Sequence, residues 1–507
     1  MKTNIERKVC GWAGILILFV WCAVCVTDVN HPPGVRWVRI GTAVLVILLG
    51  MLAYRHPSHA ICAFAIVWPQ QMVAREFLLV RVHYLFDAIP SYAGCAMTSA
   101  LLIGCAFRNR NVLESSQTPS MNPIIRIYKM VLCLFAASWV ISTLVFYIRL
   151  KILGPLENIF GPTDYRHLLE TPYDSLIRPA WATFTYLPSL LLGIVLLEDV
   201  GVDANKESDS NAAISHSQIL TALSISGAII ALQVLGDIFF KTIWFFDKWA
   251  PGGPFPNRTI AAPVLAISGA VSILQTIRIK SQIWKWILWI LGLGIIFTGC
   301  AVSKNGLFTS IVFFCLLLFS NRETVQKHVA AIISIIIVLC IAAFISYKYA
   351  GNTAPTIAQF GTLRESIRQR SRIFETAWNL WKYYPIFGSG AGTFEMLTER
   401  SSRFVCALGD GSTPCHAHNM ALNTFAELGV IPGLCWIAAW LAIPAIAIWR
   451  GIKINSFAIV VLLTGIVNLS DCVWLERGFT TVAVLLIVLF CAELSHDADL
   501  EQRGRPA

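Results

Sequence analysis

The sequence predicts an all-α fold, a polytopic membrane helical bundle of about 12–14 spans with a large helical periplasmic loop. Hydrophobic residues make up 56% of the 507 residues and charged residues only 13%, and the mean hydropathy is +0.66. A soluble domain carries about 25% charged residues, so this chain has too little polar surface to cover itself in water. Apolar runs also recur from one end of the sequence to the other.

Each predicted span is an apolar run close to the length of about 20 residues that crosses a bilayer as a helix. In chain order the runs are 11–27, 36–54, 59–80, 91–107, 127–147, 179–197, 214–236, 258–277, 285–303, 306–320, 329–348, 427–449, 454–470 and 478–494. The third run is weak because Pro69, Arg75 and Glu76 interrupt it. No small-residue cleavage site follows the first run, so we expect a first span and not a removable signal.

These runs divide the chain into three parts. Residues 1–348 contain about 11 transmembrane helices, residues 349–426 form a periplasmic loop, and residues 427–507 contain about three more helices and a cytoplasmic tail. The segment before the first run and most loops on its side are basic, which is typical of the cytoplasmic side. The loop 349–426 is also basic although it lies on the opposite side, so its cations are free to serve function.

The outer loop contains a predicted helix that begins at the capping box Thr362-Leu363-Arg364-Glu365. Its expected apolar stripe consists of Leu363, Ile367, Phe374, Trp378 and Trp381. Arg364, Arg368 and Arg372 share one face, and Arg370 lies slightly off it. These arginines either contact lipid phosphates while the helix lies on the bilayer or clamp a pyrophosphate bidentately. We favour the clamp, because like charges at this spacing cost helix stability and histidines follow downstream.

A glycine-rich segment, Gly388-Ser389-Gly390-Ala391-Gly392, follows Pro385 and ends this helix. The segment is not a dinucleotide fingerprint, because no βαβ unit surrounds it and the glycine spacing is wrong. It predicts a loop whose backbone closely approaches a ligand or a helix.

Two histidines and an asparagine, His416, His418 and Asn419, stand just before an apolar helix. Histidine is the side chain whose ordinary pKa best suits proton transfer near neutral pH. At a membrane–water boundary this pattern indicates chemistry on a lipid-borne substrate. The alternative is that His418 only packs at the start of the helix.

Two cysteines in the outer loop, Cys406 and Cys415, lie shortly before the histidines. In an oxidising periplasm they either form a disulfide or remain free thiols. The sequence leaves both alternatives open, because it does not show whether the two cysteines have the distance and orientation that a disulfide requires. Zinc binding by Cys415, His416 and His418 is a weaker alternative, since the spacing fits no structural zinc pattern well.

Two further cations are expected at the outer membrane boundary. Asn257 can cap the span that begins at Arg258, and Lys304 stands between two apolar runs with almost no loop. An ionisable residue in such a place is a candidate for function. Snorkelling to lipid phosphates is the alternative for Arg258.

The order of these motifs resembles the O-antigen ligase and O-antigen polymerase superfamily of bacterial membrane glycosyltransferases. The residues that carry the resemblance are Arg372–Trp378, Pro385–Phe394 and His416–Asn419, with Leu422, Glu427 and Gly429. The similarity is clearest over residues 250–435. The sequence departs from the pattern at Lys304, where arginine is usual, at Arg258 after Asn257, and at Gly433. These departures concern the substrate more than the class of protein.

The resemblance implies a metal-independent, inverting glycosyltransferase without a cofactor, in the bacterial inner membrane with its active site facing the periplasm. The donor would be a glycan on undecaprenyl pyrophosphate. His418 would be the general base, with His416 as the base instead or as its orienting partner. The leaving pyrophosphate would be neutralised by Arg372, Arg368, Arg364, Lys304 and Arg258. Asn419 and Glu427 would cap and position the histidine turn.

Several functions follow from this resemblance. A ligase would move a finished glycan onto the sugar hydroxyl of a lipid A-core acceptor, and a polymerase would add repeat units to a growing lipid-linked chain. A protein O-oligosaccharyltransferase is a third option. A polysaccharide transporter or flippase is an alternative of another class, although we see no paired half-repeats with broken helices. Membrane lipids account for the net charge of +10, and no nucleic-acid module is present.

Overall fold

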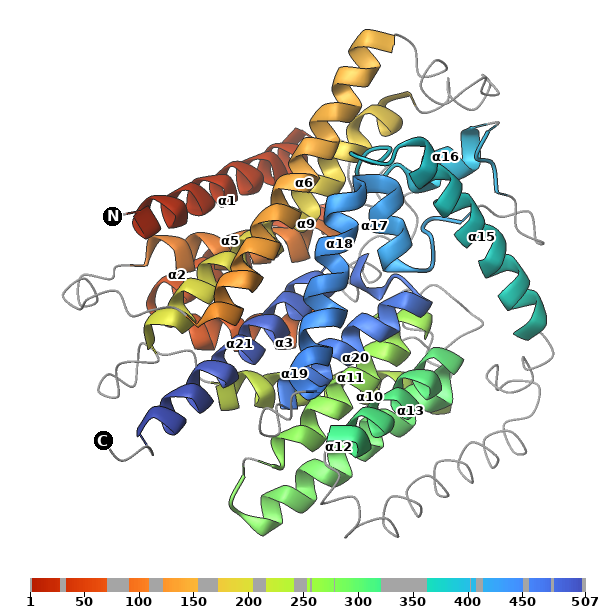
Figure 1. Ribbon diagram of the computed structural model, residues 1–507. Coiled ribbons are helices and arrows are strands. Elements are labelled where there is room, and N and C mark those ends of the chain that lie inside the picture. Colours follow the sequence, from red (N-terminus) through yellow and green to blue (C-terminus); the bar gives the residue numbers. More distant parts are fainter. Residues whose placement is uncertain are drawn as a thin grey trace.

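The computed structural model describes residues 2–27, 33–70, 91–108, 122–153, 172–203, 216–240, 253–255, 258–277, 279–320, 363–401, 403–406, 414–449, 456–475 and 478–503. Every regular element within these ranges is a helix (Figure 1). Six helices are long and apolar enough to cross a membrane, and five shorter apolar helices accompany them in the described ranges. The all-helical membrane bundle expected from composition is therefore confirmed. The predicted span 329–348 lies outside the described residues.

The helices that form the bundle are α1 (Lys2–Thr27), α2 (Pro33–Arg55), α3 (Pro57–Val67), α5 (Ser91–Phe107), α6 (Pro123–Leu153), α9 (Pro172–Asp203), α10 (His216–Phe240), α11 (Arg258–Gln275), α12 (Gln282–Val302), α13 (Lys304–Ser320), α18 (Val430–Ile437), the π-helical turn η4 (Ala438–Ala442), α19 (Ile443–Trp449), α20 (Ser456–Ser470) and α21 (Phe479–Arg503). Three helices precede α18: α15 (Leu363–Tyr383), α16 (Phe394–Arg400) and α17 (Met420–Leu428). Helix α11 packs between α10 and α12, and α9 packs against α5, α6 and α21. One apolar core runs through the bundle.

Two predicted spans differ from the helices observed. In the run 59–80, α3 ends at Val67, and a short turn η1 (Trp68–Gln70) follows at Pro69, whose ring fixes its backbone and removes a hydrogen-bond donor. Residues 71–80 of this predicted span lie outside the described residues. The run 427–449 begins one turn later than expected. Gly429, with φ +98°, separates α17 from α18, so Glu427 belongs to α17 and not to the span.

The bundle has two distinct polar ends. The site end carries Lys304, His418 and Asp471, which are described below. The opposite end carries a buried ion-pair network in which Arg7 Nη1 of α1 lies 2.5 Å from Asp199 Oδ1 of α9. Arg7 also donates to the carbonyl oxygen of Cys105 on α5. This network ties three helices together at the end that does not hold the histidines.

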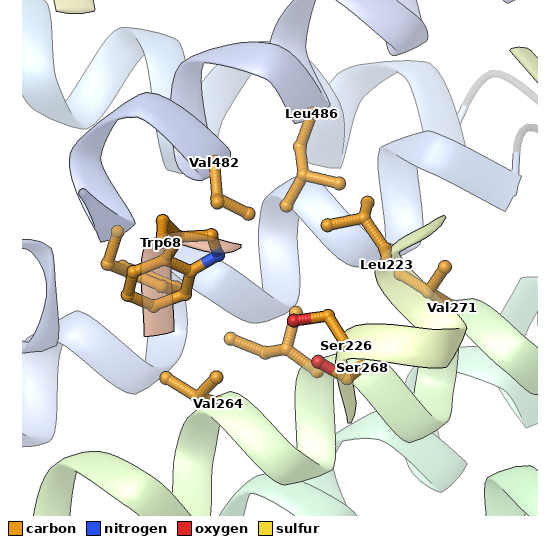
Figure 2. Close-up of a pocket in the computed structure, with 10 residues that line it drawn as sticks. Trp68, Leu223, Ser226, Val264, Ser268, Val271, Val482 and Leu486 are labelled. Carbon is orange, nitrogen blue, oxygen red and sulfur yellow. The ribbon is translucent and has the colours of Figure 1, made fainter. Parts of the chain in front are cut away.

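A small cavity lies within the bundle between η1, α10, α11 and α21 (Figure 2). Its volume is about 20 Å³, which is enough for about one water molecule. The lining is apolar except for Ser226 and Ser268, and no titratable side chain contacts it. The cavity is therefore too small and too inert to be the site of a reaction on a sugar.

Candidate active site

Helix α15 lies along the edge of the bundle beside α17 (Figure 1) and begins at Leu363, as the capping box predicts. Its buried face is Ile373, Ala377 and Leu380. The predicted stripe through Phe374 and Trp378 is therefore wrong by one position, since Trp378 is 44% exposed. A shift of one residue rotates a helix by about 100°, and this rotation decides which arginine faces the protein.

The glycine-rich segment packs against the carboxyl end of α17. The Ser389 N–H donates to the Ala426 carbonyl, and the Gly390 N–H donates to the Glu427 carbonyl. Gly388 has φ +67°, and a Cβ there would lie 2.2 Å from the Glu427 carbonyl oxygen. The predicted close approach of this backbone is confirmed, and its partner is a helix.

The histidine turn is held at the amino end of α17. Asn419 is the N-cap: its Oδ1 accepts a 3.0 Å hydrogen bond from the Leu422 N–H, and its Nδ2 donates to the Leu469 carbonyl at the end of α20. His418 has φ +49°, which makes it the one non-glycine residue with positive φ in the described part of the chain. Such a backbone conformation is uncommon and persists only where the surroundings fix it.

Asp471, which lies directly after α20, is the partner of His418. His418 Nδ1 lies 3.1 Å from Asp471 Oδ1. Oδ1 also accepts the Cys472 N–H, and Asn305 Nδ2 donates to Oδ2 at 3.1 Å. Burial alone would raise the pKa of Asp471, but the hydrogen bond and charge of His418 outweigh it, so the pKa lies below its ordinary value. Asp471 is therefore an ionised, fully hydrogen-bonded partner for the imidazole.

Sequence reasoning missed both Asp471 and Asn305. Asp471 is separated from His418 by 53 positions and follows a different helix, α20. The signal available in the sequence was an acidic residue at the outer end of the run 454–470. A charged residue is costly at the edge of a membrane span, so its presence there indicates a functional site. Asn305 follows Lys304 in the first turn of α13, where α13 packs so closely on α12 that a Cβ on Gly306 would lie 2.2 Å from the Gly299 carbonyl oxygen.

His416 has a different role from His418. Its Nδ1 accepts a 3.2 Å hydrogen bond from the His418 N–H, and the two ring centroids are 4.4 Å apart. Burial, followed by the charges of His418 and Arg370, lowers the pKa of His416 to about 4 despite the nearby Asp471. The ring is thus neutral at physiological pH, and because Nδ1 is an acceptor its proton lies on Nε2. By the same reasoning His418 donates from Nδ1 to Asp471 and keeps an acceptor at Nε2.

His416, His418 and Asp471 also form a group whose ligand atoms lie within 4.8 Å of one another, so they could hold a metal ion. The predicted zinc alternative named Cys415, but in the described residues Asp471 takes that place. Both Nδ1 atoms are already in hydrogen bonds with protein groups. Cys406 and Cys415 are both free thiols in the structure, without a bridge between them.

Three cations from separate helices face the site end. Arg258 is the first residue of α11 and Lys304 the first residue of α13. The positive charges of Arg258 and Arg370 both act on Lys304, and Arg370 also acts on His416. Arg370 precedes the buried residues Ile373 and Ala377 by about one and two turns and shares their face.

The predicted arginine face is oriented differently. Arg368 and Arg372 are exposed, and the side chain of Arg364 lies outside the described residues. The spacing of the arginines correctly grouped these residues on one face, but it could not show that the half-buried Arg370 is the arginine whose charge reaches His416 and Lys304.

Behind the turn lies a buried carboxylate. Glu427 Oε1 accepts a 2.9 Å hydrogen bond from the Phe394 N–H, and Oε2 accepts one of 3.1 Å from Asn423 Nδ2. Burial raises the pKa of Glu427 to about 7, against the hydrogen bonds from Phe394 and Asn423. The carboxylate of Glu427 is hydrogen-bonded to the Phe394 backbone and to Asn423, and not to the histidine rings.

Residues 286–437 match the family model described as O-antigen ligase, a range that includes Lys304, Arg370, both histidines and Glu427. No match to the chain was found among curated proteins.

Proposed function

We propose that this chain, whose residues 286–437 match the family model described as O-antigen ligase, transfers a glycan from undecaprenyl pyrophosphate to a sugar hydroxyl of a lipid A-core acceptor. The observation that carries the proposal is the His418–Asp471 pair, 3.1 Å apart, beside the cations Lys304 and Arg370. A base and an anion site next to each other suit the displacement of a pyrophosphate by a hydroxyl. The reaction takes place at the periplasmic face of the bacterial inner membrane.

His418 acts as the general base. Its Nε2 takes the proton of the acceptor hydroxyl as that oxygen attacks the anomeric carbon. The new carbon–oxygen bond forms while the bond to the pyrophosphate oxygen breaks, and the lipid pyrophosphate leaves with the bonding electrons. The ionised Asp471 stabilises the imidazolium that results and holds the ring orientation. Direct displacement inverts the configuration at the anomeric carbon.

His416 acts as a hydrogen-bond donor and not as the base. A base with a pKa of about 4 is too weak to take a hydroxyl proton efficiently near neutral pH. Its Nε2–H is instead suited to hold an oxygen of the acceptor or of the leaving group beside His418.

The cations Lys304, Arg258 and Arg370 neutralise the charge that develops on the leaving pyrophosphate. They come from three different helices, so their positions are fixed by the fold. The exposed residues Arg368 and Arg372, together with Arg364 on the same predicted face, bind the phosphates of lipid headgroups at the membrane surface. Fixed cations can serve the purpose of a metal ion in this type of reaction, and we propose that the reaction is metal-independent.

The test uses cells that lack the chain, complemented with the wild type, His418→Ala or Asp471→Asn. Surface glycolipid is separated by gel, and lipid-linked glycan is extracted in parallel. Long polymer stranded on undecaprenyl pyrophosphate, with bare acceptor at the surface, is the expected result for a ligase. Single repeat units would instead identify a polymerase. Full complementation by His418→Ala combined with His416→Ala, at normal membrane levels, would refute the catalytic role.

A further inference from the structure

We propose that Asn423 is the positioning residue that fixes the His416–His418 turn and links it to the buried carboxylate of Glu427. Asn423 does not touch the reacting atoms. The inference rests on the proposed function, because it assigns to Asn423 the task of holding the base His418 in place.

Asn423 uses both ends of its amide. Oδ1 accepts a 3.0 Å hydrogen bond from the N–H of Ala417, the residue between the two histidines. Nδ2 donates a 3.1 Å hydrogen bond to Glu427 Oε2. One partner is a donor and the other an acceptor, so only one orientation of the amide satisfies both. Asn423 is 2% exposed and Ala417 is fully buried, and water does not substitute for either contact.

The contact with Ala417 matters because the next residue is strained. His418 has φ +49°, a conformation that costs free energy and reverts unless its neighbours hold it. Without Asn423, the buried Ala417 N–H would lose its acceptor, and the turn would be free to rearrange. The distance between His418 and Asp471 depends on this turn.

The contact with Glu427 connects the turn to α6 and to the glycine-rich segment. The carboxylate accepts the Phe394 N–H, and the backbone carbonyl of Glu427 accepts hydrogen bonds from Ser142 Oγ of α6 and from the Gly390 N–H. Asn423 is thus the side chain between the histidine turn and the junction of α6 with the glycine-rich segment.

The experiment exchanges donor and acceptor between the two side chains. Asn423→Asp keeps an acceptor for Ala417 but sets a second carboxylate against Glu427. Glu427→Gln keeps an acceptor for Phe394 but sets two amide NH2 groups against each other. The double variant, Asn423→Asp with Glu427→Gln, restores one donor and one acceptor between the two side chains. The hydrogen bonds from Ala417 and Phe394 and the bond between the two side chains can then form again.

Glycan transfer by purified protein in detergent is measured as kcat and KM per folded molecule, with the folded amount taken from size-exclusion chromatography. We expect each single variant to lose about 10-fold or more in kcat, with a smaller change in KM, and the double variant to return to within about 3-fold of wild type. If a single variant does not fold, recovery of folded, active protein in the double variant is the expected result.

Wild-type kcat in either folded single variant would overturn the inference. So would a double variant no more active than the weaker single variant. The failure of the proposed function is a separate result: it would appear as full activity of His418→Ala, whatever the Asn423 variants do.

Discussion

His418 Nδ1 and Asp471 Oδ1 lie 3.1 Å apart although the two residues are 53 positions apart in the chain, one just before α17 and the other directly after α20. The carboxylate is fully hydrogen-bonded by His418, Asn305 and the Cys472 N–H. It is therefore held on the imidazole and cannot rotate towards the cations that face the same end of the bundle. This arrangement keeps the base and the anion site separate.

Asp471→Asn should lower kcat by about 10²–10⁴-fold, because the amide no longer stabilises the imidazolium and can impose the wrong tautomer on His418. The check is a transfer assay with KM measured alongside. Because the two residues act as a unit, adding His418→Ala to Asp471→Asn should cause little further loss. Losses that multiply would show that the residues act independently.

Arg370→Gln should lower kcat/KM by about 10–100-fold, because one of the cations at the pyrophosphate is lost. Arg372→Gln is the matched control, two positions away on the same helix and exposed, and should change kcat/KM by less than about 3-fold. The comparison uses one donor concentration series for both variants. The reverse order of effects would mean that the exposed arginine face binds the pyrophosphate.

The low pKa of His416 can be tested by measuring how the stability of the protein depends on pH. The folded-state pKa is about 4 against an ordinary 6.5, so the unfolded chain binds more protons in this window and stability falls as pH falls from 6.5 towards 4. His416→Gln should reduce this loss, as measured by thermal unfolding in detergent across the window. An unchanged pH dependence would show that His416 titrates normally.

Gly429→Ala should strongly destabilise the protein, by about 2 kcal/mol or more. A Cβ there would lie 2.0 Å from the Ile386 carbonyl oxygen, on a backbone with φ +98°. Gly294→Ala is the control, because it lies in α12 with no atom within 4 Å of the added Cβ, and it should be neutral or slightly stabilising. Thermal unfolding followed by size-exclusion chromatography compares the two variants. Equal stability would contradict the packing described for Gly429.

Treatment with a strong chelator should leave glycan transfer unchanged if the cations of the protein act on the pyrophosphate. The assay compares untreated protein, chelated protein, and chelated protein with zinc added back. Activity that is lost on chelation and regained with zinc would show that His416, His418 and Asp471 bind a catalytic metal ion. The general-base role proposed for His418 would then be wrong.

Local sequence patterns predicted the local parts of the site. The capping box marked the start of α15, and the glycine spacing indicated a close backbone approach. These features depend on residues a few positions apart, where backbone geometry limits the outcomes. The face of α15 was harder to predict, because Phe374 and Trp378 are as apolar as the buried Ile373 and Ala377, and a lipid surface accepts exposed aromatic side chains.

The long-range partners could not be predicted from one sequence. Asp471 and Asn305 reach His418 through the packing of α13, α17 and α20, and nothing in their own neighbourhoods identifies the helix they will meet. Arg370 lies slightly off the regular spacing of the arginines, yet the regularly spaced residues Arg368 and Arg372 are the exposed ones. Regular spacing groups residues on one side of a helix but does not tell which side contacts the protein.

The ion pair between Arg7 and Asp199 has a consequence for synthesis. The two residues are separated by 192 positions, so the arginine of the first helix is made and inserted long before its carboxylate partner exists. Until α9 is synthesised, α1 carries an unneutralised guanidinium at the membrane boundary, and the later arrival of Asp199 fixes its final position. Assembly of the amino-terminal part is thus completed only after about two fifths of the chain has been translated. A fragment that ends before α9 would lack the Arg7–Asp199 ion pair that joins α1 to α9.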